Sequence, residues 1–161
     1  MHSGAAKYGA VLKTSNHWKK ELGLEPHPEG GWYRRVFESE IKLETGRSAM
    51  TSIYYLLEAP DFSALHRLKS DEQWHFYCGD PITIHELDPD GNVTATVLGR
   101  GSFQHTVKGG NWFGASVDEG YALVGCTVAP GFDFLDFELP SRAQLLAAFP
   151  NQYEFIVRLS R

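Results

Sequence analysis

The chain has 161 residues, a length that fits one domain with a hydrophobic core of its own. Hydrophobic residues make up 42% of it and aromatic residues 13%, which excludes disorder and favours a lined cavity beside the core. With 20 acidic against 15 basic side chains, the formal net charge is −5. This balance argues against nucleic acid or an anionic membrane as a partner, since both usually require a basic surface.

The first twelve residues, MHSGAAKYGAVL, lack the charged start, long apolar centre and cleavage site of a signal peptide. No apolar run is long enough to span a membrane. We therefore expect a cytoplasmic protein with one domain over residues 1–161, a core of about 13–150 and a flexible segment at 1–12. Cys78 and Cys126 lie outside any CxxC motif and are expected to be buried, reduced thiols.

Helix signals stand near the two ends of the chain. In TSNHWKKELGL, Thr14 or Ser15 is the expected N-cap of a helix of about two turns that ends at Gly23. In PSRAQLLAAFP, Ser141 and Gln144 have the spacing of a capping box, and a proline closes the Leu/Ala run that follows. Both predicted helices are short.

Between these helices, ten short segments rich in β-branched and aromatic residues follow one another, separated by Gly, Pro and Asp. They are residues 32–41, 48–58, 62–68, 72–78, 82–88, 93–99, 102–107, 111–117, 121–129 and 132–139. The sequence PDGN between the fifth and sixth segments is a strong hairpin signal. The pattern predicts an all-β fold, an antiparallel sandwich or barrel, and excludes a parallel α/β fold.

Residues 63–81, SALHRLKSDEQWHFYCGDP, are predicted to form a hairpin that turns at residues 69–71. Directly opposed residues of a hairpin share a face, so this register sends one alternate set toward the interior. That set contains His66, Leu68, Glu72, Trp74 and Phe76. His75 and Tyr77 then point to the other face, unless a bulge re-aims them.

The same stretch resembles the first motif of the cupin superfamily, G-x5-H-x-H-x3-4-E-x6-G, with His66, Glu72 and Gly79 at the expected spacing. Leu68 stands where the motif has its second histidine. The second cupin motif, P-x-G-x2-H, is similar only in part to KGGNWF, where Phe113 stands in the histidine position. Two of the four metal-ligand positions of a metal cupin are therefore apolar here.

The wider pattern resembles the cupin-5 family, small cupins formerly described as a domain of unknown function. The segments HPEGGWYRRVFES, TSIYYLL, GNWFGA and GCTVAPGFDFLDFEL carry this resemblance, which runs from about residue 13 to residue 150. It implies an antiparallel jelly-roll β-barrel, a homodimer, and a small-molecule cavity with no settled activity. The short terminal helices predicted above complete this fold.

His66 and Glu72 can work without a metal, because burial and a neighbouring charge move the pKa values of an imidazole and a carboxyl group toward neutrality. By resemblance, the metal-free dTDP-sugar epimerases place their catalytic base on the strand that corresponds to that of His66. The hypothesis is that His66 abstracts or relays a proton and Glu72 orients it, in an isomerase or epimerase acting on a sugar-like or polar metabolite. No cofactor is then needed; a divalent metal held by His66 and Glu72 alone is the alternative.

Whether the chain is an enzyme stays open. A non-catalytic cupin that senses or stores a small molecule would keep the same cavity. A metal-dependent dioxygenase or lyase would need a third ligand, which the two motifs do not supply.

The segment EPHPEGGWYRRVF, residues 25–37, is predicted as a turn followed by a strand, and as the rim of the cavity. One of its adjacent arginines faces inward in an extended strand, and Arg34 is preferred over Arg35 for that place. An inward arginine needs a carboxylate or an anionic ligand as its partner. The predicted pocket residues are Glu29, Tyr33, Arg34, Trp74, Phe76, Trp112 and Phe113, whereas His27, His85 and His105 are expected at the surface.

Overall fold

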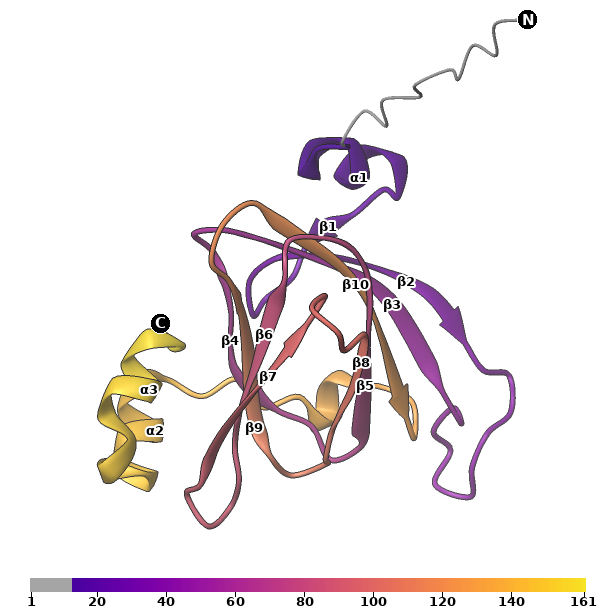
Figure 1. Ribbon diagram of the computed structural model, residues 1–161. Coiled ribbons are helices and arrows are strands. Elements are labelled where there is room, and N and C mark those ends of the chain that lie inside the picture. The colour runs from indigo at the N-terminus through magenta and orange to yellow at the C-terminus, as the bar shows by residue number, and fades with distance from the viewer. Residues whose placement is uncertain (1–12) are drawn as a thin grey trace, which may run out of the picture.

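The computed structural model describes residues 13–161, so the predicted flexibility of residues 1–12 lies outside the described part. Two antiparallel sheets face each other in a jelly-roll arrangement, without joining into one continuous barrel (Figure 1). The larger sheet has the strand order β1-β2-β3-β10-β5-β8, and the smaller sheet has the order β4-β9-β6-β7. The prediction of an all-β, antiparallel jelly roll is confirmed.

Nine of the ten predicted segments contain a strand, and β1 was not predicted. The strands are β1 (Glu25–Pro26), β2 (Trp32–Glu38), β3 (Thr51–Glu58), β4 (Phe62–Arg67), β5 (Asp71–Gly79), β6 (Ile82–Leu87), β7 (Val93–Leu98), β8 (Gln104–Val107), β9 (Trp112–Val117) and β10 (Tyr121–Ala129). The predicted strand at 132–139 is wrong, because Asp133 accepts a hydrogen bond from the amide of Leu135 and caps a 3-10 turn there, η1 (Phe134–Asp136).

The two predicted helices are present. In α1 (Ser15–Glu21) the hydroxyl of Thr14 caps the start, and Gly23 follows the end with a φ of +60°. In α2 (Arg142–Ala148) the capping box of Ser141 and Gln144 is formed. A second C-terminal helix, α3 (Tyr153–Arg158), follows the short η2 (Pro150–Gln152) and was not predicted.

The predicted hairpin between β4 and β5 is wrong. β4 pairs with β9 in the smaller sheet, whereas β5 pairs with β10 and β8 in the larger one. The link between them therefore crosses from one sheet to the other. Both arrangements send the same alternate residues to the interior, so the pattern of buried residues is the same for a hairpin and for this crossing.

The hairpin predicted at PDGN is present between β6 and β7. Leu87 lies opposite Val93, and the amide of Asp88 donates to the carbonyl of Asn92 at 3.0 Å. Gly91 has a φ of +87°, which a glycine adopts at little cost.

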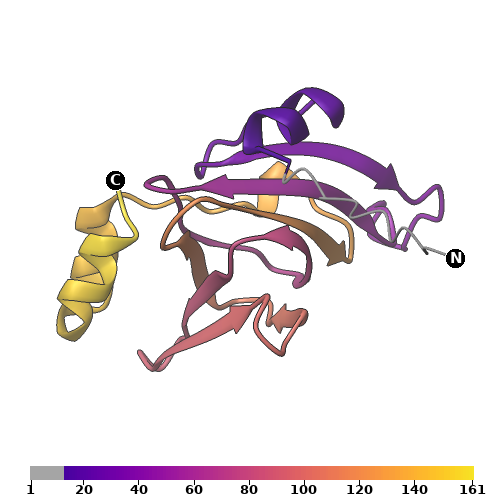
Figure 2. The same cartoon turned by 45° about the horizontal axis from the view of Figure 1, so that its top comes forward.

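Three hydrophobic clusters hold the layers together. The largest lies between the sheets and includes Tyr55, Trp74, Ile84, Leu98, Phe113 and Val124. A second joins α1 to the outer side of the larger sheet through Trp18, Trp32, Leu56 and Leu123, and a third joins α2 and α3 to β4 through Leu65, Leu145, Ile156 and Leu159. Figure 2 shows α1 above the larger sheet and the two C-terminal helices standing to one side.

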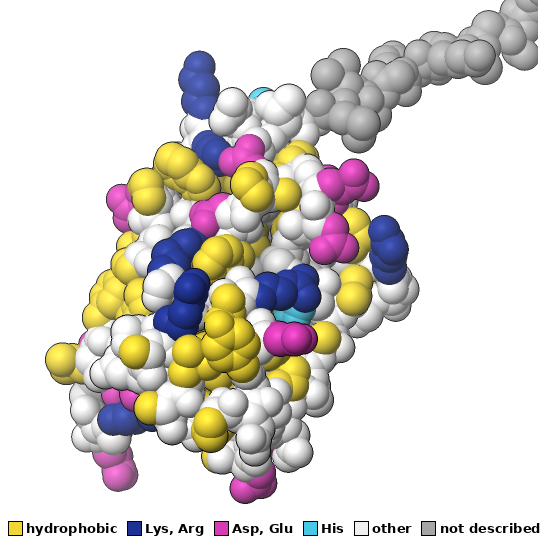
Figure 3. Space-filling view, turned by 90° about the vertical axis from the view of Figure 1, so that its left-hand side faces the viewer, with side chains coloured by type: hydrophobic (Ala, Val, Ile, Leu, Met, Phe, Trp, Pro, Cys, Tyr) yellow, Lys and Arg dark blue, Asp and Glu magenta, His cyan; other side chains and the backbone are white. Residues whose placement is uncertain are grey.

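On the side of the molecule where the C-terminal helices lie, hydrophobic groups stand beside basic side chains (Figure 3). Arg67 lies over the ring of Trp112 at 4.3 Å, and Arg161 lies over the ring of Phe62 at 4.2 Å. These stacked guanidinium groups shield part of the apolar surface from water.

No helix in residues 13–161 is long and apolar enough to cross a membrane.

Candidate functional site

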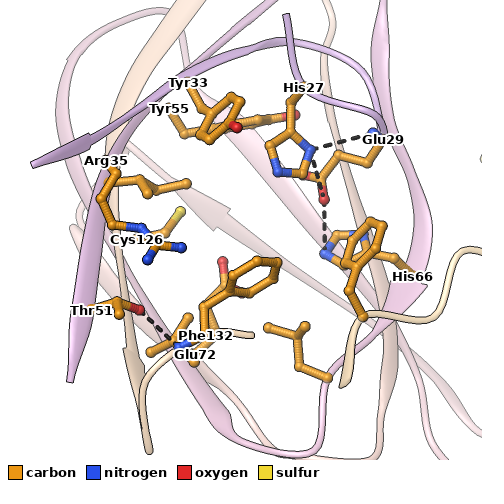
Figure 4. A pocket seen from close by; sticks show the side chains of 14 residues that line it. His27, Glu29, Tyr33, Arg35, Thr51, Tyr55, His66, Glu72, Cys126 and Phe132 are labelled. Atoms are coloured by element: carbon orange, nitrogen blue, oxygen red, sulfur yellow. Dashed lines mark hydrogen bonds and ion pairs between the residues drawn. The ribbon is translucent and has the colours of Figure 1, made fainter. Parts of the chain in front are cut away.

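A cavity lies between the two sheets and is closed on one side by the chain that follows β10 (Figure 4). It is lined by His27, Glu29, Tyr33, Arg35, Thr51, Ile53, Tyr55, His66, Leu68, Glu72, Cys126, Val128, Phe132 and Phe137. The volume of the cavity is about 40 Å³. That is room for roughly three waters, so only a small molecule or the end of a larger one fits.

The register of β2 and β3 decides which arginine faces this cavity. Arg35 lies opposite Ile53 and Tyr33 lies opposite Tyr55, and all four side chains line the cavity. Arg34 lies on the outer face, where its Nη1 donates to the carbonyl of Leu22 at the end of α1 at 3.0 Å. The preference for Arg34 was therefore wrong. Packing of α1 on the outer face of β2 fixes the register that the alternation alone left open.

The proline- and glycine-rich turn before β2 carries two polar side chains into the cavity. The amide of His27 donates to the carbonyl of Gly31 at 3.0 Å, and the Tyr55 hydroxyl donates to the carbonyl of Gly30 at 2.8 Å. A Cβ on Gly30 would lie 2.1 Å from the carbonyl oxygen of Phe62, so only glycine allows this close approach. The turn thereby places Glu29, which is 6% exposed, beside β4.

Glu29 and His66 form a buried pair at the inner end of the cavity. His66 Nδ1 lies 2.8 Å from the carbonyl oxygen of Ala64, which can only accept, so Nδ1 carries a hydrogen. His66 Nε2 lies 3.2 Å from Glu29 Oε2, and the Ser63 hydroxyl donates to Glu29 Oε1 at 2.9 Å. With its hydrogen on Nδ1, a neutral His66 turns the lone pair of Nε2 toward Oε2, so a proton on the Glu29 carboxyl group or on Nε2 relieves the repulsion between them.

Burial decides where that proton resides. Removal from water lowers the pKa of His66 to about 4, although the hydrogen bond to Ala64 opposes the shift. Removal from water also raises the pKa of Glu29, against opposing effects of His27 and of the Ser63 and Tyr55 hydroxyls. Both shifts favour the uncharged forms of the two groups, a carboxylic acid at Glu29 and a neutral imidazole at His66.

Glu72 is a second buried carboxyl group on the same cavity. Burial, followed by repulsion from Glu29, raises its pKa to about 8, and a hydrogen bond with the Cys126 thiol opposes this. Among the described residues, His66 makes its polar contacts with Glu29 and Ala64. The predicted role of Glu72 as the group that orients His66 therefore has no contact behind it, and Glu29 takes that position.

The structure places only two of the seven predicted pocket residues, Glu29 and Tyr33, on the cavity wall. Trp74 is buried in the core with its ring edge-on to Tyr55, and Phe76 packs against the same core and against Phe103. Trp112 lies under the C-terminal helices. Phe113 stacks against the His66 ring at 4.0 Å between centroids, so it backs the imidazole without lining the cavity.

The four remaining histidines named from the sequence have different places. His27 lines the cavity with 7% of its side chain exposed, and His85 is 6% exposed with its Nε2 2.9 Å from the Ser116 hydroxyl, so the surface prediction was wrong for both. His105 is partly exposed and contacts the Glu86 carboxyl group. His75 lies on the outer face of the larger sheet, as the alternation predicted.

Four polar cavity residues were not predicted from the sequence, namely His27, Thr51, Tyr55 and Cys126, and Arg35 was the less preferred of the two adjacent arginines. His27 stands between two prolines just before the Gly-Gly pair, and this turn signal could have placed it with Glu29. The inward position of Cys126 follows only from the pairing of β10 with both neighbours, which the sequence does not show. Cys78 and Cys126 are both free thiols; Cys126 is buried and Cys78 half-buried.

The donor set does not fit the metal site of the fold. Leu68 and Phe113 occupy two of the four ligand positions and have no donor atom, and His66 Nε2 already faces Glu29. Within residues 13–161, no group of three or more His, Cys, Asp or Glu side chains has the arrangement of metal ligands.

Comparison with known proteins agrees with this fold. Residues 16–140 match a family model described as Cupin superfamily (DUF985). No functionally curated protein matches the sequence.

Two solved structures are similar over nearly their whole length. A protein from Shewanella oneidensis shares 40% identity, with 93% of this chain and 99% of that one covered and a TM-score of 0.89. A hypothetical protein from Leishmania major shares 38% identity, with 92% and 99% covered and a TM-score of 0.86. Oxalate decarboxylase from Bacillus subtilis shares 18% identity, with 83% and 36% covered and a TM-score of 0.58, a likeness of fold alone.

Proposed function

The chain belongs to the cupin superfamily (DUF985), and from this premise we propose that its cavity catalyses metal-independent proton transfer on a small polar carbonyl or sugar-like metabolite. Isomerases and epimerases do this chemistry. The observation that carries the proposal is the 3.2 Å contact between Glu29 Oε2 and His66 Nε2, a buried carboxyl–imidazole pair on the cavity wall. Carboxyl groups whose pKa is raised toward 7 by burial are effective acids and bases near neutral pH.

Glu29 can accept a proton from the substrate once its own proton has moved to His66. When the Glu29 proton passes to His66 Nε2, Glu29 becomes a carboxylate that can remove a hydrogen next to a substrate carbonyl. The C–H electrons then form the double bond of an enolate, whose negative charge lies on the substrate oxygen. The imidazolium of His66 balances that charge within the cavity, and return of the proton to a different face or carbon completes an epimerisation or isomerisation.

Glu72 supplies the acid that this reaction needs. With a pKa of about 8 it is mainly protonated at neutral pH, so it can donate a hydrogen bond to the developing enolate oxygen. A neutral donor is suited to this place, since a carboxylate would repel the negative charge. The apolar walls formed by Ile53, Leu68 and Phe137 limit water and strengthen these interactions.

The experiment that tests the proposal is hydrogen–deuterium exchange in D₂O, followed by NMR, with a panel of small hydroxyaldehydes, hydroxyketones and 2-oxo acids. We expect exchange at the carbon next to the carbonyl, slowed by roughly 10²-fold or more in Glu29→Gln and in His66→Gln. His75→Gln is the matched control, because His75 lies on the outer face. The proposal fails if either cavity variant exchanges as fast as the wild type, or if no compound of the panel exchanges.

Metal independence is tested separately by native mass spectrometry of protein purified without chelators. We expect the mass of the polypeptide without a stoichiometric divalent ion, and the same exchange rate before and after treatment with EDTA. One metal ion per chain that disappears in His66→Ala, together with lost exchange, would contradict this. The same spectrum reports the number of subunits, which we propose to be two.

A further inference from the structure

Arg35 is the one described cationic side chain on the cavity wall that keeps its charge irrespective of pH. In Figure 4, Arg35 and Thr51 stand on one side of the cavity, and Glu29 and His66 stand on the other. The central carbon of the guanidinium lies 5.7 Å from the centroid of the Phe132 ring, within the range of a cation–π contact. The cavity therefore has a charged end and, across from it, the end with the Glu29–His66 pair.

Within the part of the chain that the structure describes, the charged partner of Arg35 is Glu38. The two groups meet through Nη1 alone at 3.3 Å, with 35% of the Arg35 side chain and 51% of the Glu38 side chain exposed. An ion pair this exposed contributes little, and it leaves Nε and Nη2 without a protein acceptor among residues 13–161. These nitrogens have the planar geometry that binds two oxygens of one carboxylate or phosphate.

Neither inner carboxyl group forms an ion pair with Arg35, whose carboxylate partner among residues 13–161 is Glu38. Burial also raises the pKa of both Glu29 and Glu72, which opposes their charged forms. Thr51, only 2% exposed, accepts from the amide of Phe132 at 2.9 Å, so its hydroxyl hydrogen can be directed to a ligand beside Arg35.

We propose that the cavity binds a small organic anion, with its carboxylate or phosphate group on Arg35 and Thr51 and its reactive carbon toward Glu29 and His66. This rests on the proposed proton transfer only for the position of the reactive carbon. The anion site itself follows from Arg35, its exposed competitor Glu38 and the lack, among residues 13–161, of an ion pair between Arg35 and an inner carboxyl group. The space for roughly three waters limits the ligand to a few heavy atoms beyond the charged group.

The test is a titration of the protein with glycolate, inorganic phosphate and uncharged ethylene glycol, followed in two-dimensional ¹H–¹⁵N NMR spectra. We expect at least one of the two anions to bind the wild type with a Kd in the millimolar range or below. The Kd should rise about tenfold in Arg35→Gln and stay near the wild-type value in Arg34→Gln. Arg34 is the matched control, because it is the adjacent arginine on the outer face. Glu38→Gln should bind the anion more tightly, since it removes the competing carboxylate. Preference for glycolate or for phosphate identifies which of the two groups the site takes.

The inference is overturned if neither anion binds the wild type, if ethylene glycol binds as well as glycolate, or if Arg35→Gln and Arg34→Gln weaken binding equally. Thermal melting of each variant checks that the fold is intact. Failure of the proposed function is a different result, because anion binding that depends on Arg35 would persist without any carbon exchange. Conversely, carbon exchange of a 2-oxo acid at an unchanged rate and KM in Arg35→Gln would contradict the anion site and leave the proton transfer standing.

Discussion

Glu72 is a carboxyl group almost closed off from water, with the Cys126 thiol and the Glu29 carboxyl group as its polar neighbours. Its burial penalises the charged form, so the folded protein holds the proton up to a pH of about 8. An unfolded chain releases the same proton near the ordinary pKa of 4.5. The difference couples the stability of the fold to pH.

Glu72→Gln should remove this dependence. Below pH 4.5 both states of the wild type bind the proton, whereas between 4.5 and about 8 the folded state alone binds it, so a rise in pH costs stability. We expect the free energy of unfolding of the wild type to fall relative to that of the variant across this range and to level off above it. Urea unfolding at several pH values measures the difference.

Glu38→Gln provides the control for this titration, because about half of the Glu38 side chain is exposed. The difference between its free energy of unfolding and that of the wild type should change little over the same pH range. If the difference in free energy of unfolding between the wild type and Glu72→Gln stays constant from pH 4.5 to about 8, then Glu72 ionises at its ordinary pKa.

Single residues of the site were predictable to different degrees. His66 and Glu72 follow from motif spacing, and both line the cavity. The partner of His66 did not follow, because Glu29 reaches it from a turn 37 positions earlier in the chain. The choice between Arg34 and Arg35 depends on which face of β2 the helix α1 covers, a long-range contact without a local sequence signal.

The turn before β2 is the element that assembles the site. It carries His27 and Glu29, and Gly31 at its end has a φ of +72°. A Cβ on Gly31 would lie 2.6 Å from the Tyr55 hydroxyl and 2.8 Å from the carbonyl oxygen of Leu56. Both the backbone conformation and the space therefore require glycine there.

Gly31→Ala should destabilise the fold by roughly 3 kcal/mol and abolish the Glu29–His66 contact, because the turn has to move away from β3. Gly46→Ala is the control, since Gly46 has a similar φ of +80° and no atom lies within 4 Å of the position that a Cβ would take there. That variant should cost about 1 kcal/mol, the effect of the backbone conformation alone. Equal losses in urea unfolding of the two variants would contradict the steric argument.

Strand existence was easier to predict than strand pairing. The segments of β2 to β10 stand out in the sequence because their apolar residues alternate between turn signals. The link from β4 to β5 is as short as a hairpin turn, yet it crosses between the sheets, and alternation alone does not distinguish these two arrangements.

The molecule as a whole is two facing sheets with a helix pair fastened to one of them. Leu145 and Ile156 of the C-terminal helices are almost fully buried against Leu65, the residue that precedes His66. The amide of Leu65 also donates to the carbonyl of Leu159 at 2.8 Å. The helix pair therefore supports the strand that positions the imidazole.

Leu145→Ala should lower the free energy of unfolding by about 2–5 kcal/mol, because it opens a cavity in this cluster. Leu135→Ala is the matched control, since Leu135 is 89% exposed, and its effect should stay within about 0.5 kcal/mol. Denaturant unfolding followed by tryptophan fluorescence measures both. A loss below about 1 kcal/mol in Leu145→Ala would show that the helix pair is not part of the cooperative fold.

The jelly roll was predictable because the motif order resembles the cupin-5 family and the strand spacing excludes α/β folds. The second C-terminal helix was not, since YEFIVR is too short for a clear helical period and depends on its packing against β4.

The most direct test of a one-proton pair is a pH titration of the imidazole of His66 by ¹⁵N NMR, with the signal assigned from its loss in His66→Gln. The structure predicts a neutral ring with its hydrogen on Nδ1 at neutral pH, protonated only as the pH falls toward about 4. His75 on the outer face provides the comparison within the same spectra. A His66 ring that is already doubly protonated at neutral pH would contradict this account, because Glu29 would then be a carboxylate held in an ion pair.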